Sequence, residues 1–178
     1  IKNAEKLRKD EWRNLLSEGE KIKNMWKRLK FDINLVNLYP KGRKIYTFAT
    51  GIVGSEEKVY FDTLYNGSLI SPVKISLAGN EYESFQILVI PFWQNLKDVK
   101  IEFTDLRGKK KISKDNFSIY EVRYVKLEDV DPDNPSLHKY EPDILFPVDS
   151  ISVKKGKVKS IWVDFYLPSN TPEGKYTG

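Results

Sequence analysis

The sequence contains no cysteine, one histidine and one methionine. Without cysteine the chain can form neither disulfide bonds nor a thiolate metal site, and it has no cysteine nucleophile. Its one histidine, His138, lies in a proline-rich stretch, and a single imidazole supplies neither a histidine zinc site nor a recognisable catalytic triad. We therefore expect a surface histidine, and no metal or organic cofactor.

Long apolar runs are also missing. No run reaches the roughly 20 residues that a membrane-spanning helix needs, and no segment resembles a signal peptide or a glycine-rich phosphate loop. We therefore expect no membrane span. The chain opens on Ile1 and not on methionine, which predicts a processed form or an excised fragment.

The net charge of +5 is confined to one end of the chain. The first 30 residues contain ten Lys or Arg and five Asp or Glu, whereas the other 148 residues contain twenty of each sign. Because the body of the chain is electrically balanced, it has no basic surface able to neutralise many phosphates. We therefore expect no nucleic-acid partner.

Residues 1–30 follow a helical period. Their apolar residues recur at steps of three and four and form one stripe, with members such as Trp12, Leu15, Ile22 and Trp26. A short coiled coil and a helix docked on the next domain fit this pattern equally well, and a basic amphipathic helix on an anionic membrane or in a partner's groove is the functional alternative. We assign residues 1–30 to a linker or docked helix.

From Phe31 onward the period changes to two, which indicates strands. The Asn66–Gly67 pair predicts a tight hairpin, a slip in the apolar phase predicts a bulge near Ile119, and four prolines in residues 128–149 predict a crossing between sheets. The expected strands cover residues 45–53, 58–64, 72–77, 81–90, 98–104, 117–127, 150–153 and 158–167. Many short strands and no later helix favour an immunoglobulin-like or jelly-roll β-sandwich over residues 31–178, truncated at its C-terminal end.

Residues 78–94 contain the most apolar of these strands. Phe85, Ile87 and Val89 alternate with Leu88 and Ile90, so both of its faces should be covered, as in the middle of a sheet. The amide of Gln86 must then find partners, for which backbone groups of the proline-rich crossing are the expected source.

Two sets of carboxylates were considered as chemical sites. Glu81 and Glu83 lie on one face of a strand about 7 Å apart, a spacing that glycoside cleavage uses, but no cleft is implied and edge glutamates usually bind water or turn amides. Asp129, Asp131 and Asp133 resemble the start of a calcium loop, yet Asn134 and Tyr140 stand where an EF-hand requires glycine and glutamate. We expect no metal site and no catalytic residue, with an irregular calcium geometry as the alternative.

Aromatic residues in or beside loops are the remaining candidates. Exposed rings of Trp93, Tyr140 and Phe146 could stack on the face of a sugar, and Trp93 and Tyr140 are the candidate glycan contacts. Packing within the core or the loops is the alternative interpretation of the same rings.

Several motifs occur in a family-specific order. A strand reads Gly79-x-Glu81-x-Glu83-Ser84-Phe85-Gln86, the crossing contains Pro142-Asp143-x-Leu145-x-Pro147, and the chain ends with Trp162-Val163, Pro168 and Pro172-x-Gly174-x-Tyr176-x-Gly178. Together, over about residues 58–178, they resemble the amino-terminal β-sandwich of glycoside hydrolase family 123-like proteins.

The resemblance implies a non-catalytic accessory domain. In that family the chemistry that releases N-acetylgalactosamine belongs to a following barrel domain, so no catalytic residue carries over to this sequence. The implied partner is the C-terminal catalytic domain of the same parent chain, with glycan as a further partner, and the resemblance favours a secreted or cell-surface protein. A carbohydrate-binding, adhesion or protein-interaction module is the alternative function.

Overall fold

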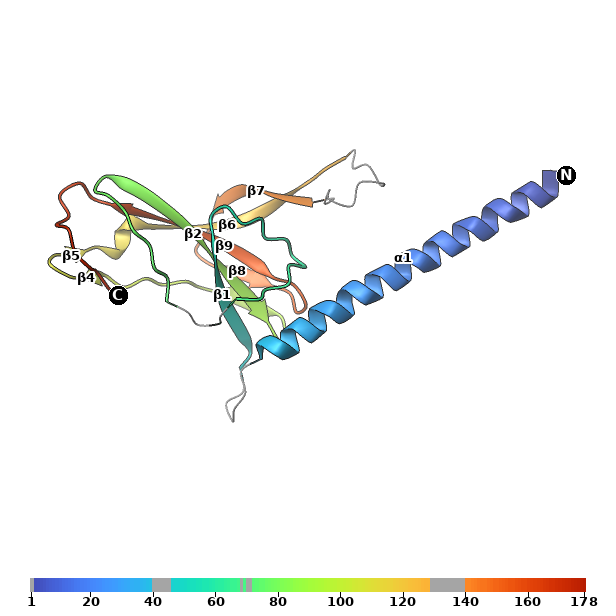
Figure 1. Cartoon of the computed structure of the whole chain (residues 1–178), viewed down its shortest axis with the longest axis horizontal. Coiled ribbons are helices and arrows are strands. Elements are labelled where there is room, and N and C mark those ends of the chain that lie inside the picture. Colours follow the sequence, from blue (N-terminus) through green and yellow to red (C-terminus); the bar gives the residue numbers. More distant parts are fainter. Residues whose placement is uncertain (1, 40–45, 68, 70–71, 129–139) are drawn as a thin grey trace. The chain divides into compact units, whose positions relative to one another are not determined.

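The protein consists mainly of β-strands preceded by one long helix (Figure 1). The computed structural model describes residues 2–39, 46–67, 69, 72–128 and 140–178. It divides into two compact units, Ile1–Leu38 and Tyr39–Gly178. The helix of the first unit cannot cross a membrane, because no helix among the described residues is both long and apolar enough.

The helix α1 spans Lys2–Leu38 and therefore continues past residue 30. The change of period expected at Phe31 was wrong. Ile33 and Val36 lie seven residues after Trp26 and Leu29, so they prolong the same helical stripe. Proline first occurs at position 40, which leaves no residue to interrupt the helix earlier.

Five antiparallel strands form the main sheet in the order β1-β2-β9-β6-β7. The central position belongs to β9, while β2, expected in the middle, is the second strand and is paired on both sides. Two further pairs, β3 with β8 and β4 with β5, form small sheets. The strand bounds are β1 Phe48–Gly54, β2 Glu81–Pro91, β3 Leu96–Val99, β4 Leu106–Arg107, β5 Lys111–Ile112, β6 Phe117–Lys126, β7 Tyr140–Pro147, β8 Ile151–Val153 and β9 Lys159–Leu167.

A hydrophobic core joins the main sheet to the β3–β8 sheet, as expected for a β-sandwich. Val89 of β2 and Ile161 of β9 cluster with Leu96, Ile151 and Val153 of the small sheet, and all five side chains are buried. These positions alternate along their strands, so each strand turns one face toward the same core.

The opposite face of the main sheet is covered by residues 55–67, which were expected to include a strand and a hairpin. Residues 58–64 are irregular apart from a turn at 61–62, and the described part of the predicted hairpin pairs with no strand. Tyr65 is buried with its ring against Gly51, and its hydroxyl accepts a 3.2 Å hydrogen bond from the Ile52 amide. Phe61 accepts from the Val158 amide at 2.9 Å. Residues 55–67 thus pack over one face of the main sheet and do not pair with its edge strand.

Gln86 ties this covering segment to the sheet. The side chain is only 3% exposed, and its Nε2 donates to the carbonyls of Gly54 at 2.9 Å and Glu57 at 2.7 Å. Its Oε1 accepts from the Ser160 hydroxyl at 2.6 Å. The expected burial is confirmed, but the expected partners in the proline-rich crossing were wrong, because the covering segment follows β1.

The proline-rich stretch is not simply a crossing between sheets. Residues 129–139 lie outside the described residues, but Tyr140–Pro147 forms β7 and pairs with β6 in the main sheet. Arg123 pairs with Ile144 and Tyr124 with Pro142, so the irregularity lies there and not near Ile119, which pairs regularly with Val163. Residues 72–77 and 100–104 form no strand.

Candidate functional site

The two predicted glycan contacts lie on or beside different strands of the main sheet. Trp93 follows β2, is 56% exposed, and has its ring centroid 5.4 Å from that of Tyr39. Tyr140 begins β7, is 38% exposed, and lies edge-on to Phe61 at 6.3 Å. Three strand spacings, about 14 Å, separate β2 from β7. The structure therefore does not bring the two rings into one site.

Phe146, the third loop aromatic considered, lies on β7 and is not in a loop. The Arg123 guanidinium lies over its ring, 3.6 Å from the centroid. This cation–π contact engages one face of the ring.

One of the two glutamates considered for catalysis takes part in a turn. Glu81 accepts a 2.7 Å hydrogen bond from the Ala78 amide, and Glu83 is exposed two residues further along β2. Asn80, directly before Glu81, adopts a left-handed φ of 69°, a conformation that asparagine tolerates better than most residues. The geometry assigns Glu81 to the turn. His138, Asp129, Asp131 and Asp133 lie outside the described residues.

A pair of tyrosines on the sheet, one exposed and one half-buried, was missed by the sequence analysis. Tyr82 of β2 pairs with Tyr166 of β9, so both side chains lie on the same face. Their ring centroids are 4.8 Å apart, and Tyr82 is 69% exposed. The Tyr166 hydroxyl donates to Oδ1 of Asn80 at 2.9 Å. The Asn80 turn thereby holds one ring of the pair in place.

A polar cluster lies beside the two tyrosines, on the same face of the sheet and two residues further along β2. Ser84 pairs with Asp164 across β2 and β9, and the Ser84 hydroxyl donates to Oδ1 of Asp164 at 2.6 Å. The same oxygen accepts from Nε1 of Trp162 at 2.6 Å. We call the six residues that form this surface the tyrosine face: Asn80, Tyr82, Ser84, Trp162, Asp164 and Tyr166.

The tyrosine face combines groups that suit a sugar. Exposed tyrosine rings can stack on the apolar face of a pyranose, and a carboxylate held by two donors can still accept from hydroxyl groups. The sequence contained part of the signal, since Trp162, Asp164 and Tyr166 alternate with the core residues of one strand. Only the pairing of β2 with β9 shows that Tyr82 and Ser84 join them.

Another polar group anchors the covering segment to β7. Tyr60 and Lys58 both donate to the Glu141 carboxylate, at 3.0 Å from the Tyr60 hydroxyl and 3.0 Å from the Lys58 Nζ to Oε2. Burial, and then the hydrogen bond with Glu141, raises the pKa of Tyr60. The neutral phenol therefore persists at ordinary pH, and the group serves as a structural tie.

An ion-pair group lies on β6 and β9. Lys159 contacts Oε1 of Glu121 at 2.5 Å, and Arg123 donates to Oε2 at 2.8 Å. Burial acts to raise the pKa of Glu121, but the hydrogen bonds from Lys159 and Arg123 outweigh it, and the net shift is downward. The carboxylate is thus held ionised between two strands.

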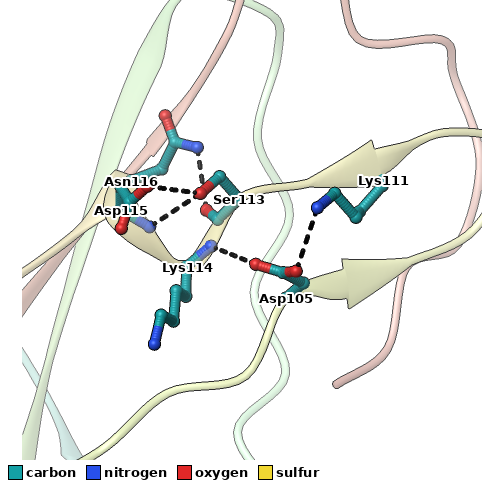
Figure 2. Close-up of polar contacts among 6 residues, drawn as sticks. All are labelled: Asp105, Lys111, Ser113, Lys114, Asp115 and Asn116. Atoms are coloured by element: carbon teal, nitrogen blue, oxygen red, sulfur yellow. Dashed lines mark hydrogen bonds and ion pairs between the residues drawn. The ribbon is translucent and has the colours of Figure 1, made fainter.

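Figure 2 shows a third polar group, at the start of β6. Asp105 accepts from the Lys114 amide at 2.9 Å and from the Lys111 Nζ at 3.2 Å, and these bonds lower its pKa. Ser113 caps the short 3-10 helix Lys114–Asn116 by accepting from the Asp115 amide at 3.2 Å. All these bonds are local to the β4–β5 turn region, so they shape the chain before β6.

Metal chemistry has no evident site in the part of the chain that the structure describes. Among those residues, no group of three or more His, Cys, Asp or Glu side chains is placed to hold a metal ion. The tyrosine face carries one carboxylate, that of Asp164, and so favours recognition over metal-assisted chemistry.

Comparisons with known proteins agree with this architecture. The chain is similar to a family 123 glycoside hydrolase from Clostridium perfringens, studied for glycolipid glycan hydrolysis, with a TM-score of 0.61 and 20% sequence identity. The match covers 74% of this chain and 23% of that chain, so this chain spans about a quarter of the length of that enzyme. No curated protein sequence matches. The family model of the glycoside hydrolase 123 N-terminal domain matches residues 79–178, and the chain belongs to that family.

Proposed function

We propose that this chain is the non-catalytic accessory domain of a larger glycoside hydrolase, where it supports a catalytic domain that follows it. The observation that carries the proposal is the match of residues 79–178 to the N-terminal domain of the family. The described residues add support, because Glu81 of β2 binds a turn amide and the polar groups on the strands tie segments of the sandwich together.

The non-catalytic role has a direct test. The purified 178-residue chain is expected to release no chromophore from aryl N-acetylhexosaminides, even at high enzyme concentration and long incubation. Turnover that persists after further purification, and that is lost on Glu81→Gln or Glu83→Gln substitution, would overturn the proposal.

The supporting role is tested by adding the chain to a family 123 catalytic domain. Binding of the sandwich to the folded catalytic domain should raise that domain's melting temperature, because a ligand of the native state stabilises it by mass action. An unchanged melting temperature over a concentration series would contradict the supporting role and leave the non-catalytic role standing.

Glycan binding is the second candidate function, and the tyrosine face favours it. Tyr82 and Tyr166 present adjacent rings with the Asp164 carboxylate and the Ser84 hydroxyl nearby on the same face. Such a surface offers stacking and hydrogen bonding together, the combination by which proteins hold sugars.

A glycan array with four forms of the chain distinguishes the candidate surfaces. If the tyrosine face binds glycan, Tyr82→Ala removes the signal while Trp93→Ala and Tyr140→Ala leave it unchanged. Both Tyr82 and Trp93 are mostly exposed, so their truncation should not unfold the sandwich. Loss on Trp93→Ala or Tyr140→Ala would locate the site at the substituted ring, and no signal in the unmodified chain would contradict glycan binding altogether.

A further inference from the structure

The helix α1 carries an apolar seam with the spacing of a coiled coil. Alternating steps of three and four residues connect eight positions over four heptads, and seven of the eight are apolar. The a positions are Trp12, Gly19, Trp26 and Ile33, and the d positions are Leu15, Ile22, Leu29 and Val36. Each of the seven apolar side chains is between 48% and 72% exposed.

An exposed seam of this length requires a partner. A single helix in water gains little from propensity alone, and an apolar stripe stabilises it only when the stripe is covered. From residue 9 to residue 30, all the positions farthest from the seam are polar: Arg13, Asn14, Ser17, Glu20, Lys21, Asn24, Lys27 and Arg28. Leu16 at an e position and Met25 at a g position flank the seam and are also exposed, so they extend the apolar surface that a second helix would cover. Farther along, Phe31 and Leu35 lie on the side away from the seam and are buried.

The charges beside the seam indicate which partner fits. Beside the seam, the g positions carry Glu11, Glu18, Met25 and Asp32, and the e positions carry Lys9, Leu16, Lys23 and Lys30, so every charged g residue is acidic and every charged e residue is lysine. In a parallel, in-register pair, each g residue faces the e residue of the following heptad in the other helix, which places Glu18 opposite Lys23. No other such pair in residues 9–37 brings like charges together.

An antiparallel pair of the same helices would be opposed by these charges. There, g residues face g residues and e residues face e residues, so acidic side chains meet acidic ones and lysines meet lysines. Like charges in these positions destabilise a helix pair. The charge pattern is therefore complementary to a second copy of α1 running in the same direction.

We propose that α1 forms a parallel, in-register coiled coil with the α1 helix of a second copy of this chain. The seam residues of the two copies pack against one another, and Glu18 of each copy pairs with Lys23 of the other. The helix thereby holds two β-sandwich domains in one assembly. This proposal is independent of the accessory role, because it concerns residues outside the family match.

Sedimentation analysis of the full chain over a concentration series tests the association. The chain is expected to form an oligomer that dissociates on dilution, and Ile22→Asp with Leu29→Asp should make it monomeric. Asn14→Asp with Asn24→Asp adds the same two charges on the polar side and should leave the association unchanged. A chain that is monomeric at every concentration, or an oligomer insensitive to the seam substitutions, would overturn the proposal.

A charge exchange tests the direction of the helices. Glu18→Lys alone places lysine opposite lysine in the parallel pair and should weaken association by roughly fivefold, since each such pair contributes a few tenths of a kcal/mol and occurs twice. Adding Lys23→Glu restores opposite charges and should restore the affinity. Tighter association on Glu18→Lys alone is the result expected of antiparallel helices, and it would refute the parallel arrangement.

Cysteine crosslinking gives an independent measure of register, because the chain has no cysteine of its own. Arg8 occupies the d position one heptad before Leu15, and Arg8→Cys removes no apolar residue from the seam. Parallel, in-register helices place the two cysteines side by side and should yield a disulfide-linked dimer on oxidation. Antiparallel helices aligned over residues 12–36 would hold them about 48 Å apart, so an oligomer that never crosslinks would refute the register.

Discussion

Ser160 donates a 2.6 Å hydrogen bond to Gln86 between two neighbouring strands, β9 and β2, and both residues are closed off from solvent. The other end of the Gln86 amide binds the carbonyls of Gly54 and Glu57. One buried side chain thus joins both strands to the segment that covers the sheet. A buried amide with all its partners specifies a unique arrangement of those segments.

Replacing Gln86 with leucine should therefore be costly despite the apolar surroundings. Gln86→Leu leaves two backbone carbonyls and the Ser160 hydroxyl without this partner, and we expect a loss of about 2 to 4 kcal/mol in the free energy of unfolding. Urea denaturation measures the change. Gln94→Leu, at an exposed position after β2, is the matched control and should change stability by less than about 0.5 kcal/mol. Equal effects of the two variants would contradict the role of Gln86.

Gly51 should tolerate no side chain beneath Tyr65. A Cβ at position 51 would lie 2.5 Å from the Tyr65 ring, so Gly51→Ala is expected to lower the free energy of unfolding by about 1 to 3 kcal/mol. In a Tyr65→Ala background the space is open, and the same substitution should have little effect. A double-mutant cycle measured by denaturation reports the coupling, and additive effects would show that the ring does not exclude the side chain.

Tyr124 should make the fold sensitive to strong alkali. Burial, followed by the charge of Asp62, raises its pKa to about 12, and its hydroxyl donates to the Val59 carbonyl at 3.0 Å. Because the folded-state pKa exceeds the ordinary value of 10.0, the contribution to stability is complete below pH 10 and is lost as pH rises toward 12. Stability measured across this range should fall less steeply for Tyr124→Phe than for the unmodified chain, and parallel curves would contradict the assignment.

Glu121 should act in the opposite direction, at acid pH. Lysine and arginine partners lower its pKa below the ordinary 4.5, so its stabilising contribution is present above that pH and is lost as pH falls through the folded-state pKa. Glu121→Gln should lower the free energy of unfolding by about 1 to 2 kcal/mol at pH 7, because Lys159 loses its charged partner. The difference between the two proteins should shrink on acidification, and a difference that is constant with pH would refute the linkage.

Strand periodicity located much of the sandwich. The alternation of Ile161, Val163 and Phe165 with Trp162, Asp164 and Tyr166 identified β9 and its core face, because strand side chains point to opposite faces in turn. The same reasoning failed for residues 58–64. Apolar residues alternate there, but the segment covers a face of the sheet and forms no strand. Apolar spacing reports which residues need burial and does not report how the backbone achieves it.

The candidate site depended more strongly on tertiary structure. Exposed loop aromatics such as Trp93 were visible in the sequence, whereas the tyrosine face requires Tyr82 and Tyr166, 84 positions apart, to become neighbours. Nothing local to either residue encodes that pairing. It follows from the order of the strands in the sheet, which is a property of the whole chain.

By itself, the sequence determined the strand-rich class, the family motifs of residues 79–178, the heptad spacing of α1 and the confinement of the net charge to the amino-terminal end. These features are written in neighbouring residues and in short periods. Only the tertiary structure decided that β9 is central, that residues 55–67 cover the sheet, and that Gln86 binds Gly54, Glu57 and Ser160. Those outcomes arise because distant segments compete to bury the same apolar faces and to satisfy the same polar groups, and that competition is settled by the complete fold.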